Sequence, residues 1–364
     1  MFTTAQFRVF TSEPEEKALS RPRHLLRDGD RTQAEAAYLQ VIAGEPGLKA
    51  AWAEYFQLLR AEGRFDDALE LAEKANERFE GDAFAGALKG AALVEMGRLR
   101  PALKYLQASA ELDPDFGMVW HEMGYAAYRL GEFNHALLAL DRAFALDPRS
   151  GTLHLRGKIL RTSGQFMAAE VAFAGAAEAA EFPEQTVEAE RQIQITRRYA
   201  YFGRRPAELN EQDRWFAEQG TVFLAGPATE AIPLEAALEA FANLAGRLDW
   251  RFTTLVPVDE WPGWTTLAKM LGIPEEPDLR PAFGLIPLIV ARKPDCTDAR
   301  WMLGTKAVAA TGAGLTFVLE QPLDHPPADV ALQMEGAESG ALDLAAAAEL
   351  ALHEEGRLAK RKLR

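Results

Sequence analysis

The chain has 364 residues, with 40 lysines and arginines against 54 aspartates and glutamates, and its formal net charge is −14. This acidic balance argues against a general nucleic-acid binder and against a polybasic membrane-surface protein, both of which present basic surfaces. The hydrophobic share of 48% and the charged share of 26% are typical of soluble globular proteins and argue against a mainly disordered chain. At about 100–200 residues per domain, the length predicts two or three domains.

Few sequence features bear on compartment or metal binding. The single cysteine, Cys296, cannot form an internal disulfide or a cysteine-rich zinc site, and the six histidines show no metal-binding spacing. The first ten residues lack the basic start and apolar core of a signal peptide, and no run of about 18 apolar residues could span a membrane. We therefore expect a cytoplasmic protein with no cofactor, no metal site and no membrane contact.

The N-terminal half carries a repeat of about 34 residues. Its units are marked by Gly29, Gly63, Gly97, Gly131 and Gly164, each followed five residues later by an alanine. Each glycine separates two stretches of helical periodicity, where it can take the left-handed conformation that ends a helix. The alanine is small because two antiparallel helices cross closely there. Each helix pair leaves an apolar face that only a neighbouring pair can cover, so the units are expected to stack.

This spacing resembles the tetratricopeptide repeat (TPR) family, whose pattern is Trp, a Leu-Gly pair, Tyr, Ala, an aromatic residue, Ala and Pro. The fourth unit matches it best, with Trp120, Met123-Gly124, Tyr128 one place late, Ala136, Leu140, Ala143 and Pro148. The resemblance covers about residues 15–181 as five units, of which the first and last are atypical. It implies a helical solenoid that binds peptides or partner proteins on a concave face lined by the first helix of each unit.

The resemblance also implies which side chains line that groove. The family's inward positions fall on Gln57, Arg60, His121, Tyr125, Tyr128, Arg129, His154, Lys158 and Arg161. The C-terminal half of the groove is then aromatic and basic, which fits a partner segment that is acidic or ends in a carboxylate. The alternative is that these residues are solvated helix-face side chains and ordinary packing aromatics.

The repeat ends near residue 180, and the sequence therefore divides into three parts. We expect a TPR solenoid over 1–183, a basic capping or linker helix over 184–205, and a different domain over 206–364. In that last part, helical stretches are predicted at 206–219, 234–248, 264–271 and 342–360. Short apolar runs at 221–225, 252–258, 285–291, 315–320 and 329–334 are predicted to be strands.

The alternation of strands and helices predicts an α/β layer with a mostly parallel sheet, and the almost wholly apolar runs predict strands buried on both faces. The expected fold class is therefore an α solenoid followed by a separate α/β domain. Asp259 and Glu260 follow the second predicted strand, where open α/β sheets place ligands, and form the candidate ligand site.

The function predicted from these features is a non-enzymatic adaptor that binds a protein partner. The segment 254–274 loosely resembles the early strand–loop–helix of phosphoribosyltransferases, which implies the alternative of a nucleotide- or sugar-phosphate-binding enzyme targeted by the repeats. That family's acidic pair with a following Thr-Gly loop is missing from the sequence, as are a P-loop, a GxGxxG motif and a Gly-x-Ser-x-Gly elbow. No residue is therefore assigned a catalytic role.

Overall fold

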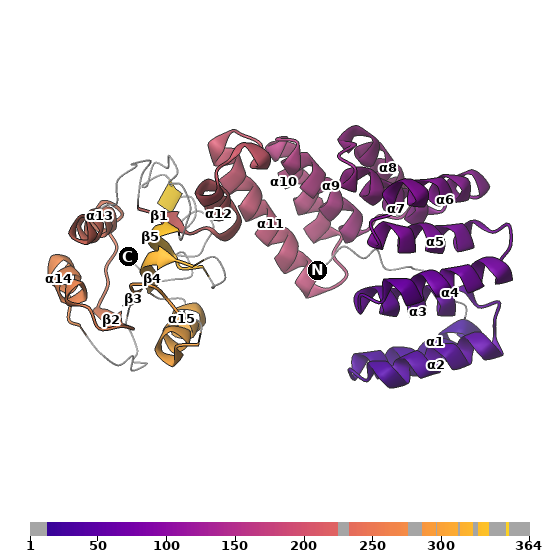
Figure 1. Ribbon diagram of the computed structural model, residues 1–364, viewed down its shortest axis with the longest axis horizontal. Coiled ribbons are helices and arrows are strands. Elements are labelled where there is room, and N and C mark those ends of the chain that lie inside the picture. The colour runs from indigo at the N-terminus through magenta and orange to yellow at the C-terminus, as the bar shows by residue number, and fades with distance from the viewer. Residues whose placement is uncertain are drawn as a thin grey trace. The chain divides into compact units, whose positions relative to one another are not determined.

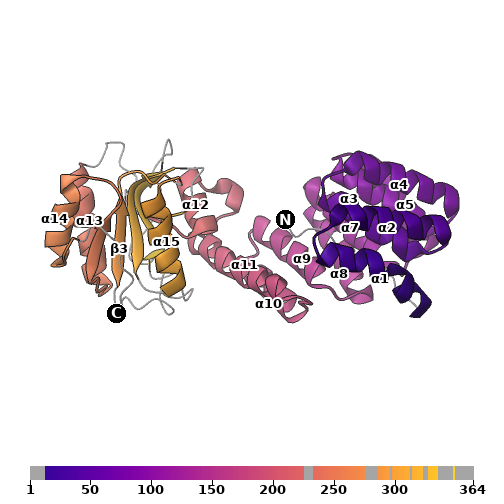
Figure 2. The same ribbon diagram turned by 90° about the horizontal axis from the view of Figure 1, so that it is seen from below.

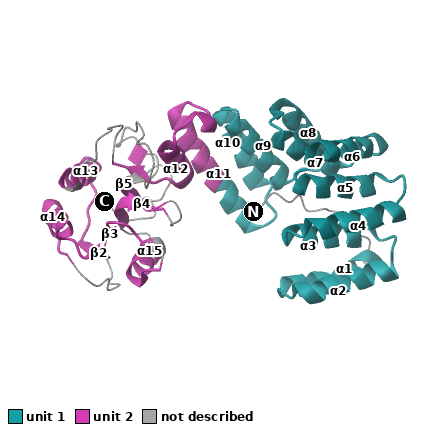
Figure 3. Cartoon of the chain, in the orientation of Figure 1, with its two compact units in different colours: residues 1–190 teal, residues 191–364 magenta. Residues whose placement is uncertain are grey.

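A computed structural model describes residues 13–224, 233–275, 286–295, 297–311, 314–322, 327–334 and 347–348. The chain divides into two compact units, Met1–Glu190 and Arg191–Arg364 (Figure 3). The predicted domain boundaries at 183 and 205 stay predictions. Cys296 lies outside the described residues, as does the predicted helix at 342–360 apart from the helical residues 347–348.

Over residues 13–178, ten helices form five antiparallel pairs, here numbered units 1 to 5 (Figure 1). The pairs are α1 Glu13–Arg27 with α2 Arg31–Gly44, α3 Lys49–Ala61 with α4 Phe65–Arg78, α5 Ala83–Glu95 with α6 Leu99–Leu112, α7 Gly117–Arg129 with α8 Phe133–Leu146, and α9 Ser150–Thr162 with α10 Phe166–Glu178. Figure 2 shows the same helices from below. The TPR-like array predicted from the 34-residue spacing is thus present, and α1 and α2 form its first unit, which was predicted to be atypical.

The turn inside each pair depends on a left-handed glycine, as predicted. The five glycines have φ values between 72° and 82°: Gly29, Gly63, Gly97, Gly131 and Gly164. Side chains with a Cβ atom adopt this conformation at a penalty, which glycine avoids. The chain therefore reverses at the same place in every unit and sets the second helix against the first.

Close approach of the two helices in each pair depends on small residues. The alanine that follows each turn glycine is fully buried, for example Ala102 and Ala136. On the opposing helix, a Cβ atom built on Gly124 would lie 2.7 Å from Leu140, and one on Gly157 would lie 2.8 Å from Phe173. The helix pairs then pack on their neighbours, and one continuous apolar cluster extends from α1 through α5.

The region after the array begins with helices that differ in part from the prediction. α11 spans Pro183–Phe202 and is one continuous helix through the division at Glu190. The single helix predicted at 206–219 is wrong: a short 3₁₀ turn, Pro206–Glu208, precedes α12, Glu211–Gln219. Asn210 breaks the two apart because its side-chain oxygen accepts a hydrogen bond from the amide of Asp213 at 2.8 Å, as a helix N-cap does.

The C-terminal unit contains a five-stranded sheet in which every neighbouring pair is parallel. Its strands are β1 Val222–Phe223, β2 Thr254–Pro257, β3 Pro287–Ala291, β4 Leu315–Gln321 and β5 Val330–Met334. They lie in the order β1-β5-β4-β3-β2. The five predicted strands and the parallel sheet are confirmed, whereas their forming a separate domain stays a prediction.

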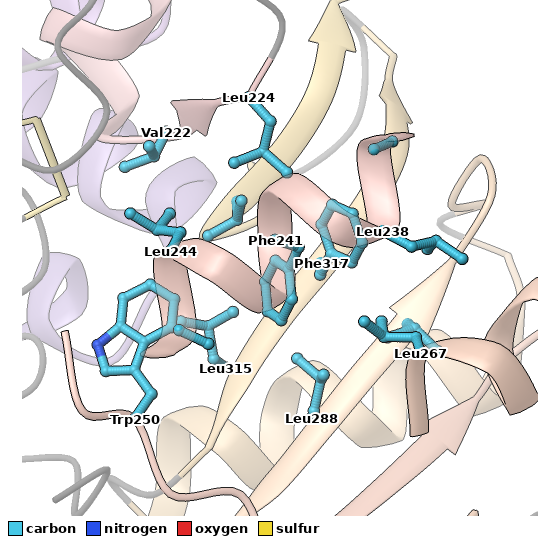
Figure 4. Close-up of a cluster of buried hydrophobic side chains, with 14 of the residues drawn as sticks. Val222, Leu224, Leu238, Phe241, Leu244, Trp250, Leu267, Leu288, Leu315 and Phe317 are labelled. Atoms are coloured by element: carbon cyan, nitrogen blue, oxygen red, sulfur yellow. The ribbon is translucent and has the colours of Figure 1, made fainter. Parts of the chain in front are cut away.

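Helices cover both faces of the sheet. On one face, α13 Leu234–Arg247 and α14 Pro262–Leu271 cover β2, β3 and β4; Phe241 stacks on Phe317 with ring centroids 4.3 Å apart (Figure 4). On the other face, Trp301 of α15, Ala299–Thr311, packs on Ile289 and Val318. α15 was not predicted, because its apolar residues follow no clear helical stripe and a glycine lies inside it. That residue, Gly304, lets the helix approach Ile289 of β3 closely.

Within the described parts of the chain, no helix combines the length and apolar character that crossing a bilayer requires.

Replacing Gly124 with alanine should destabilise the array by about 1–3 kcal/mol, because the new methyl group would overlap Leu140 in a closely packed crossing. Gly151→Ala is the matched control. Gly151 also lies in a first helix, but nothing is within 4 Å of its Cβ position, so alanine there should stabilise by at most about 1 kcal/mol. Urea unfolding followed by circular dichroism measures both changes, and equal effects would contradict the close-crossing explanation.

Candidate functional site

The first helices of successive units lie side by side, α3 against α5, α5 against α7 and α7 against α9. We call the surface formed by these four helices the first-helix face. All nine residues predicted to bind a partner lie on three of them, α3, α7 and α9. Their surroundings differ sharply along the array.

Arg60 is the centre of a buried ion cluster that joins units 2, 3 and 4. Its Nη1 lies 2.9 Å from Oε1 of Glu122 on α7, and its Nε lies 3.1 Å from Oε1 of Glu95 on α5. The side chains of Arg60 and Glu122 are each only 1% exposed. The Arg60 guanidinium also lies 5.7 Å from the ring of Phe56. Arg60 thus ties three first helices together from inside, and its role in partner binding stays a prediction.

The charge state of this cluster follows from its burial and its partners. Burial by itself would lower the pKa of Arg60, but the carboxylates of Glu122 and Glu95 outweigh it and leave that pKa raised. One guanidinium therefore faces two acids. Within the described structure, Oε2 of Glu122 is buried and has no hydrogen-bond partner. The positive charge of Arg60 offsets the free-energy cost of burying the Glu122 carboxylate.

His121 is a second buried link, between units 4 and 5. Its Nδ1 lies at hydrogen-bond distance, 3.1 Å, from Oγ1 of Thr152 on α9, and both residues are buried. Burial lowers the pKa of His121 below its ordinary 6.5, and the nearby Arg60 and Arg149 lower it further, against the opposing effect of Glu122. The imidazole is therefore held neutral at pH 7 and serves as a packing and hydrogen-bonding group.

The last turn of α7 is the accessible part of the predicted site. Arg129 is exposed and donates from Nη1 to the hydroxyl of Tyr125 at 3.3 Å, while its guanidinium lies 5.7 Å from the centre of that ring. Tyr128 is half-buried against Phe133, with ring centroids 6.2 Å apart. A cation and two tyrosines are thus found at this end of α7, with Arg129 against Tyr125 and Tyr128 against Phe133.

On α9, two predicted residues share one aromatic partner. His154 meets Phe173 edge-on at 5.3 Å between ring centres, and the Arg161 guanidinium lies 5.5 Å from the same ring. Lys158 is half-buried on the same helix. Gln57 is half-buried on α3 and is separated from α9 by α5 and α7, so the structure does not bring it to the other predicted residues.

The acids after β2 are engaged within the fold. Oδ1 of Asp259 accepts a hydrogen bond from Nε1 of Trp264 at 2.8 Å, and its Oδ2 accepts from Nε of Arg292 at 2.8 Å and from the Arg292 amide at 3.2 Å. Asp259 thereby joins the ends of β2 and β3 to the start of α14. Glu260 beside it is exposed. Among the described residues, no group of three His, Cys, Asp or Glu side chains could hold a metal ion.

Sequence reasoning did not single out Glu95, Glu122 or Thr152, which complete the buried links. Glu95 ends α5, whose other residues are apolar or glycine apart from Lys89. An isolated acid in so apolar a helix was a signal that a buried cation lies nearby. For Thr152, which is an ordinary hydroxyl near the start of a helix, the sequence carried no comparable signal.

Comparison with protein-family models finds no match, and comparison with curated proteins finds none either. Among solved structures, the chain is similar to a thermophilic TPR protein of Thermus thermophilus, with 19% identity over 49% of this chain and 98% of that one and a TM-score of 0.44. The type IV pilus biogenesis factor PilW is similar at 16% identity over 57% and 91%, with a TM-score of 0.43. Yeast Tom70 is similar at 17% identity over 53% and 42%, with a TM-score of 0.42. The TPR-like assignment rests on the chain's own five helix pairs and their spacing.

Arg60→Met should lower the free energy of unfolding by about 3–5 kcal/mol, because it leaves the Glu122 carboxylate buried without a counter-charge. Adding Glu122→Gln to that variant should recover part of the loss, since the amide carries no charge. The control is Arg142→Met, at a half-exposed arginine paired with Asp115, where the loss should stay below about 1 kcal/mol. Denaturant titration of the variants measures these differences, and no recovery in the double variant would argue against a charge effect.

Stability should fall as the pH drops below about 6.5, and His121 should contribute to the fall. The pKa of His121 is lower in the folded than in the unfolded chain, so the unfolded chain takes up the proton first and acid favours unfolding. The stability that neutral His121 contributes to the folded chain is fully present above pH 6.5. Below pH 6.5 that stability is lost, by at most about 1.4 kcal/mol for each unit by which the pH falls. His121→Asn keeps a polar atom near Thr152 but does not titrate there. The variant should show a shallower pH dependence between about pH 7.5 and 5.5, and identical slopes would contradict the assignment.

Proposed function

We propose that this protein is a TPR-like adaptor whose first-helix face binds an acidic segment of a protein partner at units 4 and 5. The observation that carries the proposal is the exposed Arg129, held against the half-buried Tyr125 at the end of α7. An arginine stacked on a tyrosine is pre-oriented to form charge-assisted hydrogen bonds with a carboxylate.

The charges on α7 and α9 support an acidic partner. α9 carries no acid and three cations, of which Arg156 is paired with Asp141 of α8, so Lys158 and Arg161 make the local charge positive although the whole chain has a net charge of −14. The one acid on α7, Glu122, is buried against Arg60 and does not offset the exposed Arg129 on the same helix. A segment of opposite charge is therefore attracted to this part of the array more than to the rest.

Units 2 and 3 offer less to a partner. The inward positions Ala53, Ala87 and Ala91 are fully buried, and Arg60 is already engaged by Glu95 and Glu122. Side chains that are covered within the array have little area left to contribute to binding. The burial of these residues supports a contact at the C-terminal half of the first-helix face rather than at units 2 and 3.

The test measures binding of a fluorescein-labelled peptide rich in aspartate and glutamate with a free C-terminal carboxylate, alongside a lysine-rich peptide of equal length. The acidic peptide should bind, and Arg129→Glu should weaken its binding at least about tenfold, a loss of roughly 1.4 kcal/mol. Arg100→Glu is the matched control, because Arg100 is exposed on the second helix α6 and the substitution changes the net charge equally. Equal binding of both peptides, or equal loss in the two variants, would overturn the proposal.

A further inference from the structure

The outward face of α10 is apolar and exposed. Met167 and Val171 are 86% and 72% exposed, more than any other large hydrophobic side chain among the described residues. Ala174 is exposed on the same helix. Residues three and four positions apart lie above one another on a helix, so these three form a single apolar stripe. We call it the α10 stripe.

The other second helices of the array do not share this chemistry. The α10 stripe consists of the second, sixth and ninth residues of its helix, and these positions are exposed in all five units. The equivalent residues are Thr32, Ala36 and Leu39 in α2; Asp66, Glu70 and Glu73 in α4; Arg100, Lys104 and Gln107 in α6; and Asn134, Leu138 and Asp141 in α8. Only in α10 are all three apolar. The three helix positions are thus equivalent in all five units, but the side chains at these positions are all apolar only in unit 5.

From this face we infer that the α10 stripe is a self-association surface, on which a second copy of the chain packs its own α10 in antiparallel orientation. The stripe is complementary to itself. With a two-fold axis at Val171, Met167 of one copy lies opposite Ala174 of the other. The large side chain at one end therefore fits the small residue at the other end, and both such contacts form together, as a two-fold symmetric interface requires.

Charge supports the same orientation. The first turn of α10 has no acidic residue, and its N-cap residue Gln165 makes no capping hydrogen bond. Glu178 stands in the last turn, where the negative end of the helix dipole disfavours an acid. In the antiparallel pair, Glu178 of each copy lies beside the positive N-terminal end of the other α10. The three residues of the stripe carry no charge, so the contact between the two stripes itself includes no carboxylate, although Glu170 lies beside it.

The interface is small, which determines how the dimer should behave. Stable complexes bury about 800 Å² on each partner, more than one helix face of this length supplies. Self-association should therefore depend on concentration in the micromolar range or above, with the monomer as the folded unit. A single charge at Val171, the centre of the contact, should be enough to abolish it.

Sedimentation equilibrium of the full chain over about 10–500 μM tests this inference. The wild-type chain should shift from monomer to dimer as its concentration rises, and Val171→Glu should weaken association at least tenfold. Lys104→Glu makes the same new side chain at the equivalent position of α6 and should change association less than twofold. A wild-type chain that is monomeric throughout, or a dimer unaffected by Val171→Glu, would overturn the inference.

Cross-linking tests the orientation. In a Cys296→Ser background, which removes the only native thiol, Val171→Cys places one thiol of each copy at the two-fold axis. A short bismaleimide should join these chains into covalent dimers, whereas Lys104→Cys treated alike should stay monomeric. Equal cross-linking from the two positions would show that any association does not centre on α10 and would refute the proposed packing.

Discussion

The helical half of this protein depends on how closely the two helices of each pair can approach. A buried alanine on the second helix and, in three units, a glycine on the first remove the side-chain volume that would hold them apart, at Gly90, Gly124 and Gly157. The left-handed glycine turn between the helices sets the angle at which they meet. Because this geometry is local to each unit, it can be repeated along the chain, and units 2 to 5 present their first helices to the same surface.

This local origin explains what the sequence could predict. The glycine, alanine and proline spacing indicated five helix pairs and their stacking, since each signal acts within one unit. The Arg60 cluster could not be predicted in the same way, because Glu95 and Glu122 lie 35 and 62 residues away from Arg60 along the chain. Arg60 and His121 were singled out as groove residues from their positions in the repeat. Their burial depends on how successive units curve against each other, which repeat position alone does not determine.

In the C-terminal unit the apolar runs predicted all five strands, because burial on both faces demands continuous hydrophobic sequence. The order of those strands was not predictable, since apolar runs do not encode their neighbours. α15 was missed because it packs through Trp301 and Gly304 rather than through a regular apolar stripe. Asp259 was correctly placed at the end of β2, but the sequence could not show that Arg292 and Trp264 use its oxygens. An acidic residue at the carboxyl end of a parallel strand can therefore either join neighbouring loops within the fold or bind a ligand.

The pairing of β1 has a consequence for the order in which the chain folds during synthesis. β1 pairs with β5, with Val222 beside Val330, and Thr221 donates to the carbonyl of Ala328, 107 residues further on. Each helix pair of the array, in contrast, is complete once about 34 residues have been made. The repeats can therefore fold one after another as they leave the ribosome, whereas β1 cannot pair until β5, more than 100 residues later, has been translated. During that interval its apolar edge is exposed, so the stretch from 221 to 330 is where a slow or interrupted ribosome would leave this protein most prone to aggregation.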